Sequence, residues 1–334
     1  MYDLSKVVVT SSPHIKTNES TRSIMLDVII ALMPALVVSV LCFGGRALVL
    51  TVVGAVAAVI FEAIYNKILH KPNTIGDLSA VVTGILLVYN VPVSMPIWMV
   101  IVGVGFAIIV AKCLFGGIGK NFINPALAGR AFLMASWASA MTTWVGSGTK
   151  LALFSTPIDV VTEATPLSYM KNGELAPYSL MQLFVGQTGG CLGEISAAAL
   201  IIGGLYLVFR KVITLRTPLA YILTVAVITF LFPKGDNSHM MWMLQNLLSG
   251  GLMLGAIFMA TDYTTSPVTP KGQIVFGVGC GLITVLIRYF GGYPEGVSYS
   301  ILIMNCLVWA IDKVCLPKKF GYVEPEKKSK EVKA

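Results

Sequence analysis

The amino-acid sequence predicts an all-α integral membrane protein of about ten transmembrane helices, arranged as two inverted five-helix repeats. Three observations lead to this prediction. Of the 334 residues, 56% are hydrophobic and only 12% are charged, whereas soluble domains carry roughly 25% charged residues. Ten apolar runs follow one another along the chain, and parts of its two halves resemble each other. An ordinary water-facing surface cannot be assembled from this composition.

The apolar runs are separated by short polar connections, and several are shorter than the roughly 20 helical residues that cross a bilayer. The third run ends at Pro92, and the fifth begins at Asn124-Pro125. Short segments interrupted by Gly or Pro at membrane depth usually line a cavity or a site buried in protein. The ten runs cover residues 24–43, 47–66, 78–91, 96–115, 123–140, 195–209, 217–232, 244–261, 273–290 and 296–315.

Internal similarity suggests the two halves. The segment 84–96 resembles 255–267, and the Phe-Gly-Gly strings at 115–117 and 290–292 follow at nearly the same offset. Each copy supplies the third and fourth runs of a five-run unit, and an odd number of spans places the second unit upside down in the membrane. We therefore divide the chain into an N-terminal segment 1–22, a first repeat 23–140, a connection 141–194, a second repeat 195–316 and a basic tail 317–334.

The distribution of charge predicts the orientation in the membrane. The net charge is +8, and the basic residues gather at the ends of alternate runs and in the C-terminal tail. Cytoplasmic connections are enriched in Lys and Arg, so we expect both termini in the cytoplasm and the connection 141–194 outside it. This pattern accounts for the basic balance without nucleic acid, which we do not expect as a partner.

No metal site is expected from the cysteines. The six cysteines are scattered, mostly in apolar runs, without a CxxC pair or a zinc-like spacing with histidine. Such cysteines usually behave as small buried hydrophobic residues. The sequence also offers no set of residues that would form a complete catalytic site, and we assign none.

Polar residues within the apolar runs are the first candidates for function. Asn124-Pro125-Ala126 occurs once, and we interpret Asn124 as a helix cap with Pro125 at the first helical position, in preference to a water pore. Arg130 needs a partner acid, for which we name Asp77 or Asp262, or else contacts an anionic ligand or cofactor. Other acids near spans are candidates for an ion path, because a carboxylate within the membrane is costly unless it is paired or hydrated. For each one we favour the interpretation that it lies at the end of a run and reaches water: Asp27, Glu62, Glu194, Glu295 and Asp312.

Four strings, taken together, carry a family resemblance. They are Ser12-Pro-His14, Asn121-Phe-Ile-Asn-Pro-Ala-Leu-Ala-Gly-Arg130, Thr162-Glu-Ala-Thr165, and Tyr293-Pro-Glu-Gly-Val297 with Asn305. From about residue 8 to residue 316, the chain resembles the D subunits of Rnf electron-transfer complexes (RnfD). The B subunits of sodium-pumping NADH:quinone reductases are more distant relatives. Members of this family resemble urea transporters in fold, with two inverted five-span units.

The resemblance implies a covalent cofactor in the connection 141–194. In the family, a flavin transferase attaches FMN through its phosphate to a threonine in an Asp-x-x-(Ser/Thr)-Gly-Ala-Thr pattern. Asp159, Thr162, Ala164 and Thr165 match this pattern, while Glu163 stands where Gly is usual. The resemblance thus implies FMN on Thr165, outside the cytoplasm, and is compatible with a second, non-covalent flavin such as riboflavin.

By resemblance, the chain is a membrane subunit of a ferredoxin:NAD⁺ oxidoreductase that couples electron transfer to Na⁺ or H⁺ transport. The implied location is the bacterial cytoplasmic membrane. The implied partners are the other Rnf subunits (A, B, C, E and G), the flavin transferase and the lipid bilayer. NAD and iron–sulfur clusters would belong to those other subunits, since the chain lacks a dinucleotide-binding loop and cluster-binding cysteines. The alternative is a stand-alone solute channel or transporter on the same scaffold, which would have no use for the string around Thr165.

Overall fold

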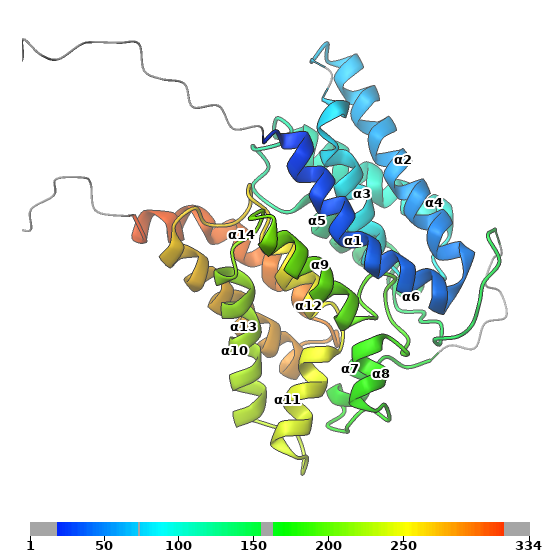
Figure 1. The fold of residues 1–334 in the computed structure, drawn as a ribbon, viewed down its shortest axis with the longest axis vertical. Coiled ribbons are helices and arrows are strands. Elements are labelled where there is room, and N and C mark those ends of the chain that lie inside the picture. The colour runs from blue at the N-terminus through cyan, green and yellow to red at the C-terminus, as the bar shows by residue number, and fades with distance from the viewer. Residues whose placement is uncertain (1–18, 73, 155–162, 317–334) are drawn as a thin grey trace, which may run out of the picture.

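The computed structural model describes residues 19–72, 74–154 and 163–316, and apart from one isolated bridge their regular structure is helical. Figure 1 shows the N-terminal elements packed beside the C-terminal ones. The first group comprises α1 Thr21–Phe43, α2 Gly45–Ile68, η2 Ile75–Asp77, α3 Ser79–Tyr89, α4 Ile97–Gly105, η3 Phe106–Cys113, α5 Pro125–Ser136 and α6 Ala138–Met141. Two short helices follow, α7 Pro166–Lys171 and α8 Leu180–Val185. The second group comprises α9 Ala197–Phe209, α10 Arg216–Leu231, α11 His239–Leu248, α12 Leu252–Leu254, η4 Gly255–Met259, α13 Pro270–Phe290 and α14 Val297–Val314.

Four helices of the described residues are long and apolar enough to cross a membrane: α1, α2, α13 and α14. A fifth crossing arises if α11 and the segment Leu252–Met259, bent by 63° at their junction, count as one span. Four shorter apolar helices accompany them, over Ser79–Tyr89, Ile97–Cys113, Ala197–Phe209 and Arg216–Leu231. The chain is therefore a helical, multi-pass membrane protein. Each of the ten predicted apolar runs contains at least one helix.

The side chains of α1 show which face meets lipid. Its most exposed large residues recur every three or four positions, as expected of one helix face, and are between 44% and 67% exposed. They are Leu26, Ile30, Met33, Val37 and Leu41. The opposite face buries Asp27, Ala31, Ala35 and Ser39. An apolar outside with small and polar residues inside suits a helix that is solvated by lipid and packed against other helices.

Close backbone contacts hold the helices together. A Cβ atom at Gly203 of α9 would lie 2.0 Å from the carbonyl oxygen of Ala31 in α1. Likewise, a Cβ at Gly84 of α3 would lie 2.5 Å from the carbonyl oxygen of Gly54 in α2. Glycine is required at both contacts, because small residues let membrane helices approach closely. The contact between α1 and α9 joins the two groups of helices (Figure 1).

The start of α5 confirms the interpretation of Asn124. Its side chain accepts hydrogen bonds from the backbone N–H groups of Ala126 and Leu127, at 3.0 and 3.3 Å. Pro125 occupies the first turn, where its missing N–H costs nothing. Asn124 also donates its side-chain amide to the carbonyl of Met259, at 3.4 Å. This cap sets the position of α5, and with it that of Arg130.

Candidate functional site

Thr165 lies at the start of α7 and is 7% exposed. Its hydroxyl is 3.0 Å from the hydroxyl of Ser168. The Thr-Pro pair begins a helix, because Pro166 fits the first helical position. A hydroxyl this deeply buried needs a local movement of the chain before an enzyme can modify it.

The short helix α7 is held against the second group of helices. Leu167 and Met170 pack around the buried ring of Trp242 in α11. The side chain of Gln245 in α11 exchanges two hydrogen bonds with the backbone of Ala176, at 2.9 and 3.1 Å. Thr165 is thereby placed over the end of α11 by packing as well as by its own loop.

A cavity of about 610 Å³ lies next to Thr165. Ala164 and Ser168, its neighbours along the chain, line it, together with the rings of Trp144 and Tyr293 and the carboxylate-bearing Glu295. Ligand cavities in proteins usually measure about 300–1,000 Å³ and combine apolar or aromatic walls with a few polar groups. The volume of this cavity therefore lies within the range of small-molecule sites.

Glu163, which stands where glycine is usual in the family pattern, also lines this cavity. Its carboxylate accepts a hydrogen bond from the hydroxyl of Tyr178. Burial and this hydrogen bond raise the pKa of the Tyr178 phenol above its ordinary value, so Tyr178 stays protonated and keeps donating. The glutamate is therefore held within the connection by Tyr178.

The segment that precedes α9 carries Glu194 into the interior. Cys191 forms an isolated antiparallel bridge with Pro92, and the N–H of Gly193 donates to the carbonyl of Tyr89, at 2.9 Å. A Cβ atom at Gly193 would lie 2.3 Å from the Tyr89 ring, so this approach requires glycine. Segments about 100 residues apart in sequence, before α9 and after α3, are thus fixed side by side.

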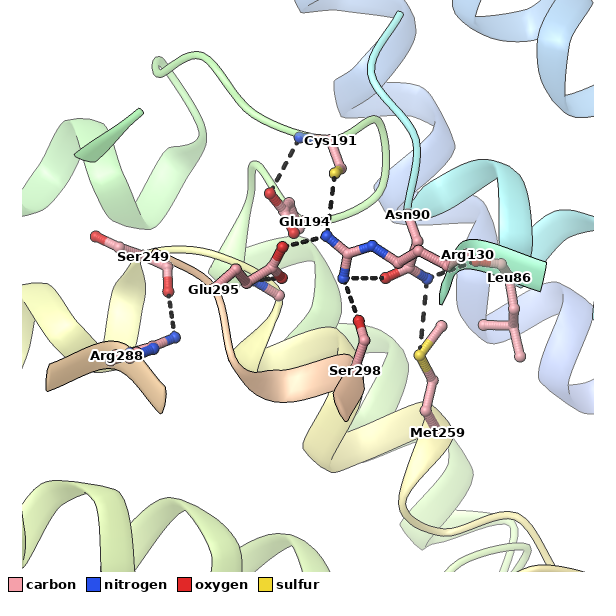
Figure 2. A network of polar contacts seen from close by, with 11 residues as sticks. Leu86, Asn90, Arg130, Cys191, Glu194, Ser249, Met259, Arg288, Glu295 and Ser298 are labelled. Atoms are coloured by element: carbon pink, nitrogen blue, oxygen red, sulfur yellow. Dashed lines mark hydrogen bonds and ion pairs between the residues drawn. The ribbon is translucent and has the colours of Figure 1, made fainter. Parts of the chain in front are cut away.

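Arg130 lies at the centre of a buried polar network (Figure 2) and is 4% exposed. Its guanidinium forms an ion pair with Glu295 and donates to the hydroxyl of Ser298. Further contacts reach the side-chain oxygen of Asn90 at 3.4 Å and the sulfur of Cys191 at 3.9 Å. The network therefore joins α5, the loop before α14, the end of α3 and the segment before α9.

A partner acid for Arg130 was predicted correctly, but the predicted residues were wrong. The Asp77 carboxylate accepts hydrogen bonds from the backbone and hydroxyl of Ser79, at 2.8 and 2.6 Å. Asp262 accepts from the hydroxyls of Thr264 and Thr265, both at 3.1 Å. Both aspartates are thus used by their own turns, and Glu295 supplies the counter-charge. Glu295 lines the cavity beside Thr165. Arg130 therefore contacts a residue of the cavity wall without lining the cavity itself.

The interpretation of the other acids as water-reaching end caps was wrong for three of them, which are buried. Asp27 accepts from Tyr206 at 2.8 Å and pairs with Arg210 at 3.2 Å. Glu62 pairs with Lys112 at 3.2 Å. Glu194 is 7% exposed and lines a small cavity that Thr165 also lines. A carboxylate inside a bundle needs partners, since an unpaired charge there is costly.

Of the predicted site residues, the structure brings Ala164, Thr165 and Arg130 into one neighbourhood. Asp159 and Thr162 lie outside the described residues. Sequence reasoning missed that Glu194 and Glu295 converge on this place. Glu295 lies within the string Tyr293–Val297, which carries part of the family resemblance. That string was the one feature of the sequence that could have marked Glu295 as a site residue.

Comparisons with known proteins bear on what this site does. A model of the NQR2, RnfD, RnfE family matches residues 8–321. The D subunit of the Na(+)-translocating ferredoxin:NAD(+) oxidoreductase complex of Acetobacterium woodii is 49% identical over 327 residues, or 97% of this chain and 98% of that protein. The proton-translocating counterpart of Clostridium ljungdahlii is 44% identical over 94% of this chain and 96% of its own. The D subunit of an ion-translocating oxidoreductase complex of Actinobacillus succinogenes is 35% identical over 94% of this chain and 98% of its own.

Proposed function

Because this chain belongs to the NQR2, RnfD, RnfE family, we propose that it is the membrane-embedded RnfD component of an ion-translocating ferredoxin:NAD⁺ oxidoreductase. The observation that carries this proposal is the similarity to such components over nearly the full length of both chains. It favours an electron-transfer role over a stand-alone solute channel. The chain would work with the other Rnf subunits (A, B, C, E and G) in one complex.

We further propose that FMN is attached through its phosphate to the Thr165 hydroxyl by a flavin transferase. The residues present fit this group, since Thr165 adjoins a cavity of about 610 Å³ with aromatic and polar walls. When bound there, FMN supplies one- and two-electron redox chemistry. The chain itself would position Thr165 by packing α7 against α11. It would also supply Trp144 and Tyr293 to the wall of the cavity. Asp159 and Thr162 would serve the transferase as its recognition sequence.

The proposed topology is ten spans in two inverted units of five. Two observations support it. Five of the ten apolar runs lie before the connection and five after it, and a helix overlaps each of them. Lys and Arg gather in alternate connections. We accordingly place both termini in the cytoplasm of a bacterial cell and the flavin connection on the other side of its inner membrane.

A denaturing gel tests the flavin proposal. The full chain is produced in a host that carries the transferase and is viewed for flavin fluorescence. We expect a fluorescent band, its absence for Thr165→Ala, and its retention for Thr188→Ala, a buried threonine that lines the neighbouring smaller cavity. A dark wild-type band would contradict the proposal, as would a fluorescent Thr165→Ala band.

We also propose a place for a second, non-covalent flavin such as riboflavin. A cavity of about 290 Å³ lies between α1, α3, α5 and η4, near the lower end of the range for small-molecule sites, roughly 300 Å³. Leu86 and Phe258 are among its apolar walls, and Lys112, Asn121 and Asp262 add polar groups. Riboflavin released on denaturation, separated by chromatography from protein-bound FMN, would support this assignment.

A further inference from the structure

A second, much smaller cavity of about 30 Å³ lies directly beside Thr165. Thr165, Glu194, Ser249 and Glu295 are among the residues that line it. Two polar atoms in its wall have no hydrogen-bond partner in the described part of the chain: Oε2 of Glu194 and the hydroxyl oxygen of Ser249. These two residues are only 7% and 2% exposed. The cavity is thus a small space whose wall presents unsatisfied oxygens.

The unsatisfied oxygen of Glu194 needs a partner for energetic reasons. Its other oxygen accepts the N–H of Cys191 at 3.1 Å, so only one half of the carboxylate is satisfied. A buried carboxylate without a partner is strongly disfavoured and takes up a proton or a cation instead. A volume of about 30 Å³ holds one or two water-sized groups, because one water needs roughly 10–15 Å³.

A second carboxylate converges on the same point. A Cβ atom built on Gly251 would lie 2.6 Å from Oε1 of Glu295 and 3.0 Å from Oε2 of Glu194. Oε1 of Glu295 accepts the N–H of Gly251 at 3.1 Å, and its Oε2 is occupied by Arg130. Figure 2 shows the two glutamates beside each other. Glycine at position 251 therefore keeps open the space in which the two carboxylates meet.

The charges around the cavity determine what it can hold. The charged groups facing Glu194 are Glu295 before α14, Arg130 of α5 and Arg288 of α13, and Cys191 is the titratable thiol on its own segment. Arg288 donates to the carbonyls of Asn246 and Ser249 at the end of α11, at 2.6 and 3.3 Å. With every group charged, two arginines and two glutamates cancel. One bound cation brings the total to +1, which is also the total when Glu194 is protonated.

We propose that Glu194, together with Ser249, holds one exchangeable monovalent cation, Na⁺ or H⁺, in this cavity beside Thr165. The inference rests on the proposed function, for which it names the binding site of the transported ion. Oxygen atoms are the ligands of hard cations, and the cavity offers a carboxylate oxygen and a hydroxyl. Since Arg130 and Arg288 already offset two carboxylates, a single added positive charge suits this environment better than a divalent ion does.

The similar proteins are consistent with one site for either ion. One relative is named as Na⁺-translocating and another as proton-translocating. A single carboxylate can exchange one ion for the other without a change in the local charge. Negative charge placed at Thr165 would strengthen binding of the cation, and by linkage the cation would favour that negative charge.

The test compares Glu194→Gln with the wild-type complex in proteoliposomes. The amide keeps the shape of the side chain but carries no negative charge to balance Na⁺ and does not take up H⁺. During electron transfer from ferredoxin to NAD⁺, Na⁺ uptake is followed with radioactive sodium and H⁺ uptake with a pH-sensitive dye. We expect ion uptake per electron to fall by about tenfold or more in Glu194→Gln, since a charged partner is lost. The exposed Glu174→Gln serves as the matched control and should leave uptake unchanged.

A second measurement covers the case in which Glu194→Gln does not assemble. Ser249→Ala removes only the hydroxyl ligand, and we expect it to raise the Na⁺ concentration for half-maximal uptake several-fold. In a Na⁺-binding protein, NaCl in place of choline chloride should raise the melting temperature of the wild-type complex, less so at low pH. In an H⁺-binding protein, acidification without added Na⁺ should raise the melting temperature of the wild-type complex.

The outcomes separate the two proposals. If Glu194→Gln and Ser249→Ala take up ions like the wild type while the flavin band is present, the cation site is wrong and the flavin assignment stands. If the wild-type band carries no flavin and the complex transfers no electrons, the proposed function fails and this inference fails with it. Loss of uptake in Glu194→Gln with the flavin band retained supports the cation site.

Discussion

Arg130 and Glu295 form a buried ion pair between residues 165 positions apart in the chain. The sequence allowed the prediction that Arg130 needs a counter-charge, because an unpaired arginine inside a membrane protein is costly. It did not reveal the partner, since several acids lie near the ends of apolar runs and only the packing of α14 beside α5 selects one. A local feature, by contrast, could be predicted from neighbouring residues, as the Asn124 cap with Pro125 at the first helical position shows.

Replacing one partner of this ion pair should lower the stability of the protein more than replacing both partners. We expect Arg130→Met to lower the free energy of unfolding by about 3–5 kcal/mol, because it leaves the Glu295 charge buried without a partner. Adding Glu295→Gln to Arg130→Met removes that charge and should recover part of the loss. Thermal unfolding in detergent of the two single variants and the double variant measures the coupling. A double variant as unstable as the sum of the single variants would contradict the ion pair.

At the scale of helices, composition predicted the outer elements well and the broken ones poorly. The runs 24–43 and 47–66 correspond to α1 and α2 within a few residues, because long uninterrupted apolar segments leave few alternatives. The run 244–261 is continuous in hydropathy, yet it forms two helical pieces bent by 63° around the Ser-Gly-Gly segment 249–251. The break serves the site, since it supplies the Ser249 hydroxyl and the Gly251 N–H. Hydropathy does not report where a helix is interrupted.

The outward face of α1 makes a prediction about lipid exposure. Val37 is 54% exposed in the middle of this apolar face. A lysine there would place a charge in the hydrocarbon region, at a cost of about 2.5–3.5 kcal/mol near the helix centre. We expect Val37→Lys to reduce the amount of folded protein in the membrane fraction, whereas Val37→Phe should not. Equal yields of the two variants would show that this face does not meet lipid.

At the scale of the whole molecule, the arrangement is two groups of helices joined by the contact between α1 and α9, with α7 and α8 of the connection packed against α11 (Figure 1). The polar network around Arg130 draws on both groups and on this connection. The proposed flavin threonine and the proposed cation site therefore lie at the junction of the two groups. A relative movement of the groups would act on both sites together, which is what coupling between them requires.

Thiol labelling tests the proposed orientation. With the native cysteines replaced, we expect Lys150→Cys to react with a membrane-impermeant maleimide added outside intact spheroplasts, because this position lies in the connection assigned to that side. Lys271→Cys, at the start of α13, should react only after permeabilisation. Both lysines are exposed in the structure, so access to reagent depends on their side of the membrane. The reverse pattern would invert the topology and place Thr165 in the cytoplasm.

Mass spectrometry of the chain, purified from a host with the transferase, tests the proposed attachment of FMN to Thr165. Proteolytic peptides that span the connection are fragmented to locate any added mass. We expect one peptide heavier by FMN less one water, with the added mass on Thr165 and not on Thr162, Ser168 or Thr188. A peptide with unmodified Thr165, or FMN found on another residue, would contradict it.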